Sequence, residues 1–334
     1  SAWPVIDPTP LVDEWYVDAM ADHGEAWARG EIKNLMVHIR PRMGKTKIMS
    51  VLLNGWIWTW RPRARVLSSS YSDHRRAEDA RLTRELITSP WYQARWPLPM
   101  SSDQGKKEMF ALASGGHRYT AIWGSAATGD GGDYLSADDP QNASDMYSPT
   151  ELERDFAWFN DTWARRRNDE ATSGMMFVCQ RLGPRDLGNM IRVSAPGQWD
   201  VLALETRKTV VDTAPYYRYL EDGTVKIDRL PKVDTALSRE GRYIDPREPG
   251  DLLSSRVDPD ELAAFEKASP TVADAQEGQS PPLRSPGMIQ LYRFGPGNVG
   301  SFASRMGCPS LREACILALK SGWVATAGGD HGVG

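Results

Sequence analysis

The sequence has 334 residues, of which 40% are hydrophobic and 25% are charged, so it fits one large or two unequal globular domains and excludes a small disulfide-stapled scaffold. Its net charge of -4 excludes a chain that coats nucleic acid through bulk positive charge, but leaves room for a local basic groove. No apolar run approaches the roughly 18 residues of a membrane span, and residues 1–18 lack the basic region of a secretory signal. Three cysteines at spacings typical of neither zinc nor disulfide frameworks indicate a reducing compartment.

Strand and helix patterns alternate through the first half of the chain. Short apolar runs predict strands, and longer segments with apolar residues near helical spacing predict helices. The predicted strands are 34–39, 65–71, 119–123, 134–137 and 174–179, and the predicted helices are 11–29, 45–60, 73–88 and 151–167. Such alternation is typical of a largely parallel sheet with helices on both faces, so we predict an α/β fold.

The pattern weakens after residue 186. Short strands are predicted over 201–204 and 224–227, and a helix over 258–267. The segment 276–287 is rich in Pro, Ser and Gly, which predicts a linker with a boundary near residue 287. The glycine-rich segment 288–334 contains one predicted helix, over 311–320, and no other predicted element.

The strongest chemical signal is the segment 40–46, Arg-Pro-Arg-Met-Gly-Lys-Thr, which lies between a predicted strand and a predicted helix. Triphosphate binding needs backbone N–H groups at a helix N-terminus, an ammonium for the phosphate oxygens and a hydroxyl for magnesium. Gly44, Lys45 and Thr46 supply these three groups. Ile39 stands where the full phosphate-loop pattern has its first glycine. A solvated helix start is therefore the alternative interpretation of this motif alone.

Two acidic residues, Asp138 and Asp139, follow the predicted strand 134–137, about ninety residues after the loop. A phosphate-loop enzyme needs one carboxylate at a strand end to help hold the metal and a second to polarise the attacking water. Asp138 and Asp139 fit these roles in that order. The alternative is an Asp-Asp-Pro turn, and Ser136 counts against a central strand because such strands are usually more apolar.

Five blocks of sequence carry a likeness to a known family. They are 28–46, 69–73, 87–93, 128–133 with 138–140, and 179–187. In this order and spacing they resemble the ATPase half of tailed-phage terminase large subunits. The resemblance implies a P-loop NTPase fold and a motor that uses ATP and Mg²⁺ to package double-stranded DNA into a procapsid. It also implies a homo-oligomeric ring, with a portal protein and a terminase small subunit as partners, in the host cytoplasm and transiently at the portal, with no membrane partner.

The resemblance also implies roles for single residues. Members of this branch carry an arginine in a deviant phosphate loop, and Arg42 stands there, so that Arg42 and Met43 are expected to bind nucleotide together with Gly44, Lys45 and Thr46. Gln180 matches the residue thought to sense γ-phosphate and couple hydrolysis to movement. Arg166 is expected to reach a neighbouring subunit's nucleotide as an arginine finger, with a solvated basic helix end as the alternative. The catalytic set is then Asp139, Gln180 and Arg166, and the metal set is Thr46 and Asp138.

The chain is accordingly divided into an ATPase domain (1–200), the end of that domain with a linker (201–287) and a short tail (288–334). Two-metal nuclease chemistry needs several carboxylates, and the tail holds only Glu313 and Asp330, so no complete nuclease is predicted. Two other functions stay open. One is a non-catalytic portal- or DNA-binding assembly protein derived from such a motor, and the other is a helicase-like ATPase.

The sequence allows two interpretations of one set of arginines. The residues Arg75, Arg76, Arg81 and Arg84 share the predicted helix 73–88 and could track DNA phosphates. Acidic residues interleave them, which favours a solvated helix face.

Overall fold

The computed structural model of the protein describes residues 2–102, 109–125 and 129–283. Within these ranges, eight strands form one sheet in the order β10-β7-β1-β6-β5-β2-β4-β3. The strands are β1 (Asn34–Ile39), β2 (Arg65–Ser70), β3 (Met109–Ala111), β4 (His117–Ile122), β5 (Tyr134–Asp138), β6 (Gly174–Cys179), β7 (Asp200–Leu204) and β10 (Val233–Asp234). The strands from β7 to β4 run parallel, whereas β10 and β3 pair antiparallel at the two edges. The predicted α/β fold with a mostly parallel sheet is confirmed.

The centre of the sheet is apolar on both faces, as expected for parallel strands that helices cover. Every residue of β1 and β5 is buried. The central strands also carry buried polar residues, among them His38, Ser68 and Ser136, and Ser136 is the one whose polarity argued from the sequence against a central strand. Its hydroxyl lies 3.2 Å from that of Ser68 on the neighbouring strand β2, so each buried hydroxyl has a partner. A paired serine is compatible with a central strand because the cost of burial falls on unpaired polar groups.

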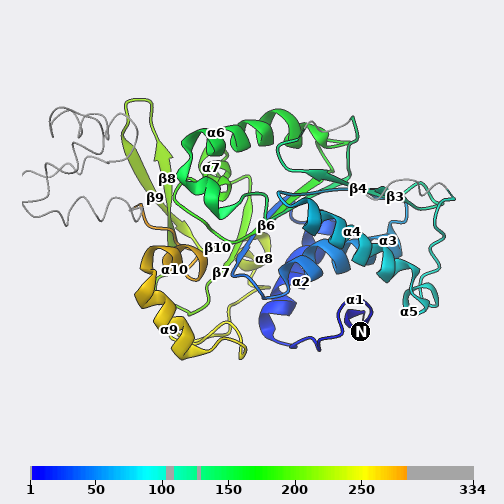
Figure 1. The fold of residues 1–334 in the computed structure, drawn as a ribbon, viewed down its shortest axis with the longest axis horizontal. Helices are drawn as coiled ribbons and strands as arrows, with labels where there is room; N and C mark the ends of the chain where they lie inside the picture. Colours follow the sequence, from blue (N-terminus) through cyan, green and yellow to red (C-terminus); the bar gives the residue numbers. More distant parts are fainter. Residues whose placement is uncertain (1, 103–108, 126–128, 284–334) are drawn as a thin grey trace, which may run out of the picture.

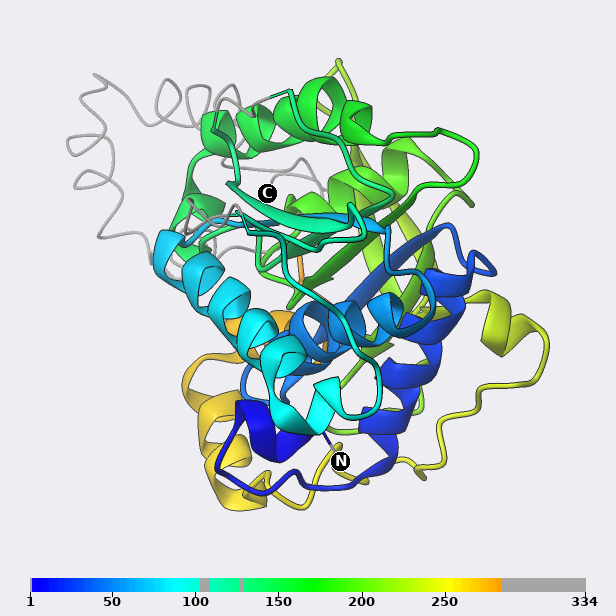
Figure 2. The same ribbon diagram turned by 90° about the vertical axis from the view of Figure 1, so that its right-hand side faces the viewer.

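Helices cover both faces of the sheet (Figures 1 and 2). They are α1 (Trp3–Ile6), α2 (Trp15–Arg29), α3 (Leu53–Trp60), α4 (Asp73–Thr88), α5 (Pro90–Gln93), α6 (Pro149–Trp158), α7 (Leu187–Ser194), α8 (Ala236–Arg239), α9 (Pro259–Ala268) and α10 (Pro270–Gln276). Alternate residues of β1 face opposite sides: Val37 joins the core beneath α2, α3 and α4, and Met36 joins the core beneath α6 and α7. The sheet therefore separates two hydrophobic cores.

Two predicted helices are less regular than their sequences suggest. The helix expected over 45–60 contains a π segment, Lys47–Leu52, before α3. There the Ser50 carbonyl accepts hydrogen bonds from Asn54 Nδ2 at 2.7 Å and from Arg118 Nη1 at 2.8 Å. Side chains thus donate to a backbone carbonyl in the segment where the i→i−4 hydrogen bonds of the α-helix are shifted. The helix expected over 151–167 is α-helical only through Trp158 and continues as the π turn Phe159–Trp163 and the 3-10 turn Ala164–Arg166.

Beyond residue 186, the structure contains elements that the weak pattern did not predict. They include α7, α10 and the strand β8 (Thr213–Tyr219), which pairs with β9 (Val225–Pro231) in a separate two-stranded hairpin. The hairpin extends away from the main sheet in Figure 1. Because β7 and β10 belong to the main sheet, residues on both sides of position 200 build it.

The described part of the predicted linker 276–287 is packed against residues that are distant in the sequence. Gln279 is fully buried, and its Oε1 accepts a hydrogen bond from the backbone N–H of Arg181 at 3.0 Å. The Tyr217 hydroxyl donates to the Pro281 carbonyl at 2.9 Å. A linker assignment is therefore wrong for residues 277–283, because their burial arises from distant partners that a composition rich in turn residues does not reveal. The expected boundary near 287 and the helix over 311–320 lie outside the described residues.

Among the helices that the structure describes, none combines the length and apolar character needed to cross a bilayer.

Candidate functional site

The residues singled out in the phosphate-loop motif and in the acidic pair lie at one edge of the sheet. The loop 40–44 leaves the carboxyl end of β1, and Asp138 is the last residue of β5. Strand β6 lies between β1 and β5, so the two loops are separated by one strand. The carboxyl edge of a parallel sheet is where α/β proteins usually bind ligands.

The loop after β1 has a backbone suited to wrapping an anion. Arg42 and Gly44 have φ values of 71° and 75°, in the left-handed region. Glycine adopts this region without strain, whereas an arginine there is held by its surroundings and is uncommon. The helix that follows begins at Lys45, since residues 45 and 46 are already helical and the Ile48 N–H donates to the Gly44 carbonyl at 3.0 Å. The first N–H groups of a helix have no partner within the helix, so this helix start at the end of the loop is suited to a bound anion.

The cationic and hydroxyl groups of the loop meet the two carboxylates directly. Lys45 Nζ lies 2.8 Å from Asp139 Oδ2, and the Thr46 hydroxyl donates to Asp138 Oδ2 at 2.5 Å. Lys45 and Asp138 are buried. Asp139 has a φ of 42° and is fixed by its N–H, which donates to the Val178 carbonyl on β6 at 2.8 Å. The fold therefore joins two motifs that lie more than ninety residues apart in the sequence.

The electrostatics of this cluster follow from its burial. Burial, reinforced by the charge of Asp139, raises the pKa of Asp138 to about 6. Burial alone would lower the pKa of Lys45, but the carboxylates of Asp139 and Asp138 outweigh it and raise that pKa above its usual value. Lys45 is therefore a permanent cation at neutral pH, available to bind a polyanion.

The chemistry of Thr46 and Asp138 fits magnesium. Asp138 Oδ1 is buried and has no hydrogen-bond partner in the described structure, and Oδ2 is already paired with the Thr46 hydroxyl. Hard oxygen donors of this kind suit Mg²⁺. Within the described residues no group of three or more His, Cys, Asp or Glu could hold a metal by itself. Phosphate oxygens and water would thus have to complete the coordination, which is how proteins commonly hold this ion.

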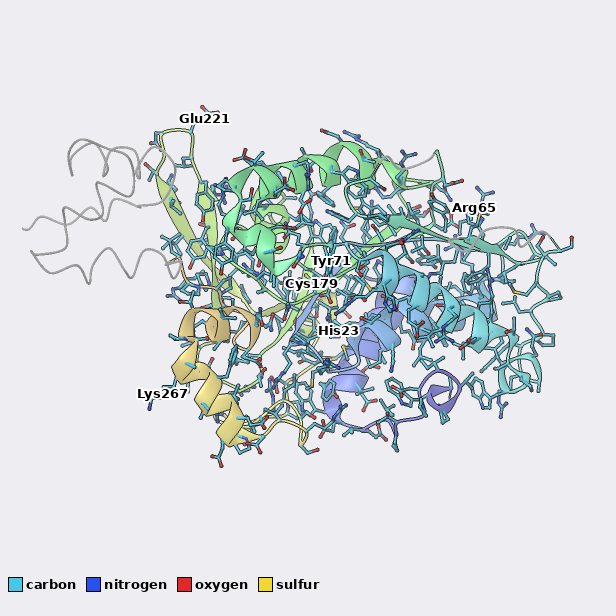
Figure 3. The ribbon with its side chains drawn as sticks, in the orientation of Figure 1. His23, Arg65, Tyr71, Cys179, Glu221 and Lys267 are labelled. Atoms are coloured by element: carbon cyan, nitrogen blue, oxygen red, sulfur yellow. The ribbon has the colours of Figure 1, made fainter. Side chains whose placement is uncertain are left out.

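A cavity of about 130 Å³ opens beside the carboxylate of Asp139. Its lining includes Tyr71, Arg75, Asp139, Cys179 and Gln180. Gln180 directly follows β6, and its Oε1 is buried without a hydrogen-bond partner in the described structure. Figure 3 labels Tyr71 and Cys179, which lie close together near the middle of the molecule. An amide beside Asp139 with a free acceptor is suited to orient a water molecule or a phosphate oxygen.

The remaining loop residues differ in what they offer. The Met43 side chain is buried in the core beneath α2 and α3, so only its backbone is available to a ligand. The Arg42 side chain is exposed.

Arg166 does not join the cluster. Its carbonyl accepts from the N–H of Gly132, which precedes β5, whereas Asp138 ends β5. Arg166 therefore lies at the amino edge of the sheet, opposite Lys45. A finger role in the chain's own site is not supported by this geometry, and a role in a neighbouring subunit's site stays a prediction.

The arginines of α4 have separate surroundings. Arg81 pairs with Glu78 and Glu85 on its own helix, as expected for a solvated face. Arg75 instead reaches Asp139, with Nη1 3.3 Å from Oδ2. The sequence placed Arg75 in a set that could track DNA phosphates and favoured a solvated helix face for that set, so its contact with Asp139 was not predicted. One feature of the sequence could have indicated this contact. Arg75 lies in the first turn of the helix that follows β2, and β2 is the neighbour of β5, which ends at the two aspartates.

Comparison with known proteins adds little. No protein-family model and no curated protein matches the sequence. A similar solved structure is the large terminase of HK97 bacteriophage, with 11% sequence identity and a TM-score of 0.41, over 61% of this chain and 42% of that one. The chain thus spans less than half the length of that terminase. The functional proposal therefore rests on the residues of the site.

Proposed function

We propose that this chain is an ATPase that acts as the motor subunit of a machine translocating double-stranded DNA into a viral procapsid. The observation that carries the ATPase assignment is the convergence of Lys45 and Thr46 on Asp139 and Asp138, at 2.8 Å and 2.5 Å, in the first turn of the helix that follows the loop 40–44. The motor assignment rests on the five sequence blocks that resemble terminase large subunits.

The proposed phosphate contacts follow from the loop. Lys45 leaves Asp139 for the β- and γ-phosphate oxygens, and the N–H groups of residues 43–46 bind the β-phosphate. Thr46 and Asp138 hold Mg²⁺, which when bound neutralises charge on the phosphate oxygens. Lys45 thus exchanges its internal partner, the single charge of Asp139, for the triphosphate, which carries more negative charge.

The proposed reaction is hydrolysis of the terminal phosphoanhydride bond. The oxygen of a water molecule forms a bond to the γ-phosphorus, and the bond between that phosphorus and the oxygen bridging to the β-phosphate breaks, giving ADP and inorganic phosphate. Asp139, released by Lys45, orients this water and accepts its proton, which then passes to solvent or to the phosphate product. Gln180 holds the water on its free Oε1.

Steady-state ATP hydrolysis by the full chain, with and without double-stranded DNA, tests the proposal. We expect turnover that DNA stimulates and that Lys45→Ala abolishes. Lys226→Ala, which removes an exposed lysine from β9, is the matched control and should leave the rate unchanged. Equal rates for Lys45→Ala and the parent would refute the ATPase assignment.

Two outcomes would favour the other functions. ATP binding without turnover, in the presence of DNA and of the portal protein, would favour a non-catalytic assembly protein. Strand separation without packaging would favour a helicase-like enzyme. The polar Ser136, which counted against a central strand and so against the metal role of the carboxylate after it, no longer does so because that hydroxyl is paired with Ser68.

A further inference from the structure

We propose that Arg75 is a γ-phosphate sensor, held on Asp139 until a triphosphate binds. This inference rests on the proposed ATPase function and adds a residue to the same site. In the sequence Arg75 is one of four arginines on a single helix, and only its contacts distinguish it from the others.

The backbone of Arg75 is fixed at the carboxyl edge of the sheet. Helix α4 begins just after β2, and its N-cap Ser72 accepts a hydrogen bond from the Arg75 N–H. Strand β2 pairs with β5, whose carboxyl end carries the two aspartates. The Tyr71 N–H also approaches the Asp139 carbonyl, at 3.5 Å. The first turn of α4 is thus anchored beside Asp139.

The guanidinium of Arg75 shares one oxygen with Lys45. Asp139 Oδ2 lies 3.3 Å from Arg75 Nη1 and 2.8 Å from Lys45 Nζ. Two cations on a single carboxylate oxygen exceed the charge that this carboxylate supplies. A phosphate group, with more negative charge and three terminal oxygens, is a better partner for both cations.

Exposure separates Arg75 from the groups that are fixed in the site. Its side chain is 55% exposed, compared with 8% for Lys45 and 13% for Asp139. Its one contact with Asp139 is long for a charged hydrogen bond. The guanidinium can therefore move to a nearby anion while the backbone stays in place.

The neighbouring Arg76 shows the contrast. Its guanidinium donates to Asp73 and to the Thr120 carbonyl, at 2.8 Å for the latter, and its side chain is only 11% exposed. Arg76 is thus tied to the sheet, whereas Arg75 lines the cavity that also contains Asp139 and Gln180. The two adjacent arginines have different roles because only one of them faces the site.

The sensor acts by exchange of partners. Without triphosphate, Arg75 and Lys45 neutralise Asp139 and keep it from acting on water. With triphosphate, both cations move to the phosphates, and Asp139 is released to orient the nucleophile. ADP lacks the terminal phosphate, so it engages Lys45 but not Arg75.

Equilibrium binding to the full chain tests this exchange, with Mg²⁺-ADP and the non-hydrolysable Mg²⁺-adenylyl imidodiphosphate as probes. We expect Arg75→Ala to weaken binding of the triphosphate analogue by about tenfold and to leave ADP affinity within about twofold of the parent. Arg75→Lys should recover part of the loss. Arg81→Ala, which removes an arginine from the same helix outside the site, should change neither affinity.

The outcomes are distinguishable. Equal affinities of Arg75→Ala and the parent for both probes, or equal losses for both, would overturn the sensor role while leaving the ATPase assignment intact. A parent chain that binds neither probe would overturn the ATPase assignment and the sensor role together. A selective loss of double-stranded DNA binding in Arg75→Ala, with both nucleotide affinities intact, would instead assign Arg75 to a DNA contact.

Discussion

The two edges of the main sheet differ in the kind of residue they gather. At the carboxyl edge, Lys45, Asp138 and Asp139 are brought together with their charges largely buried. At the amino edge, the Arg166 carbonyl accepts a hydrogen bond from the N–H of Gly132, which lies just before β5. Figure 3 shows the separation along one strand: Arg65 begins β2, and Tyr71 lies just past its other end.

The difference shows which edge of the sheet gathers the groups that could bind a ligand. Parallel strands with helical crossovers send every loop that enters a helix N-terminus to the carboxyl edge, so anion-binding groups collect there. At the amino edge the chain returns from the helices to the strands, and backbone hydrogen bonds such as that from Gly132 to Arg166 join its segments. Substitutions at the carboxyl edge should therefore change activity first, and substitutions at the amino edge should change stability first.

The largest expected effect compares one residue from each edge in the isolated chain. Asp139→Asn should lower the rate of ATP hydrolysis by about 10³-fold, because the carboxamide cannot accept the proton from water. Arg166→Ala should change the basal rate less than twofold, since it lies at the opposite edge of the sheet. Steady-state ATPase assays of both variants check this, and a large loss in Arg166→Ala would break the comparison.

At the amino edge, a single added methyl group should be costly. A Cβ on Gly116 would collide with the Pro62 carbonyl oxygen and lie 3.0 Å from that of Ala64. We expect Gly116→Ala to reduce the free energy of unfolding by about 2–3 kcal/mol, as measured by denaturant titration. Gly129→Ala, where the described structure leaves open space around the new carbon, is the control and should be near neutral.

Acidification should destabilise the protein through His38, near the carboxyl end of β1. Burial, with a contribution from the Arg181 charge, lowers the pKa of His38 to about 3. The unfolded chain therefore binds the proton more readily, and stability falls as the pH drops below about 6.5. We expect His38→Gln to lose about 2 kcal/mol less than the parent between pH 7 and pH 5. Identical losses in the two proteins would show that this imidazole is not held neutral by the fold.

The smallest expected effect has the opposite sign and concerns Asp79 on α4. Burial, reinforced by the charge of Asp138, raises the pKa of Asp79 to about 7. The folded protein thus holds this proton more tightly than the unfolded chain, so stability falls as the pH rises from about 4 to 7. Asp79→Asn should raise the free energy of unfolding by about 1 kcal/mol at pH 8 and by less at pH 5.

The exposed Asp18→Asn is the control for Asp79→Asn, because it removes an acidic charge from a helix without removing a buried one. A destabilised Asp79→Asn protein at pH 8 would mean that the carboxylate charge is stabilising in the folded state. That result would contradict the expectation that the charge of Asp79, which burial and the nearby Asp138 disfavour, destabilises the folded protein.

How much the sequence predicts depends on whether the relevant forces are local. The strands over 34–39 and 174–179 and the helix over 73–88 have the predicted bounds. Their limits coincide with strong signals, such as the apolar runs and the Ser72 cap. The π segment within 45–60 was not predicted, because it is linked to the distant Arg118. The packed segment 277–283 escaped prediction because its partners, among them Arg181 and Tyr217, are distant in the sequence.

The sequence by itself determined the alternation of strands and helices and the residue types of the proposed phosphate site, since apolar periodicity and short motifs are local properties of a chain. Only the tertiary structure decided which of these residues meet. It brought Lys45 to Asp139 across 94 positions and added Arg75 to the same carboxylate. It also left Arg166 at the opposite edge. Such choices depend on strand order and register, which are fixed by the packing of both faces of the sheet and are not written in any single segment.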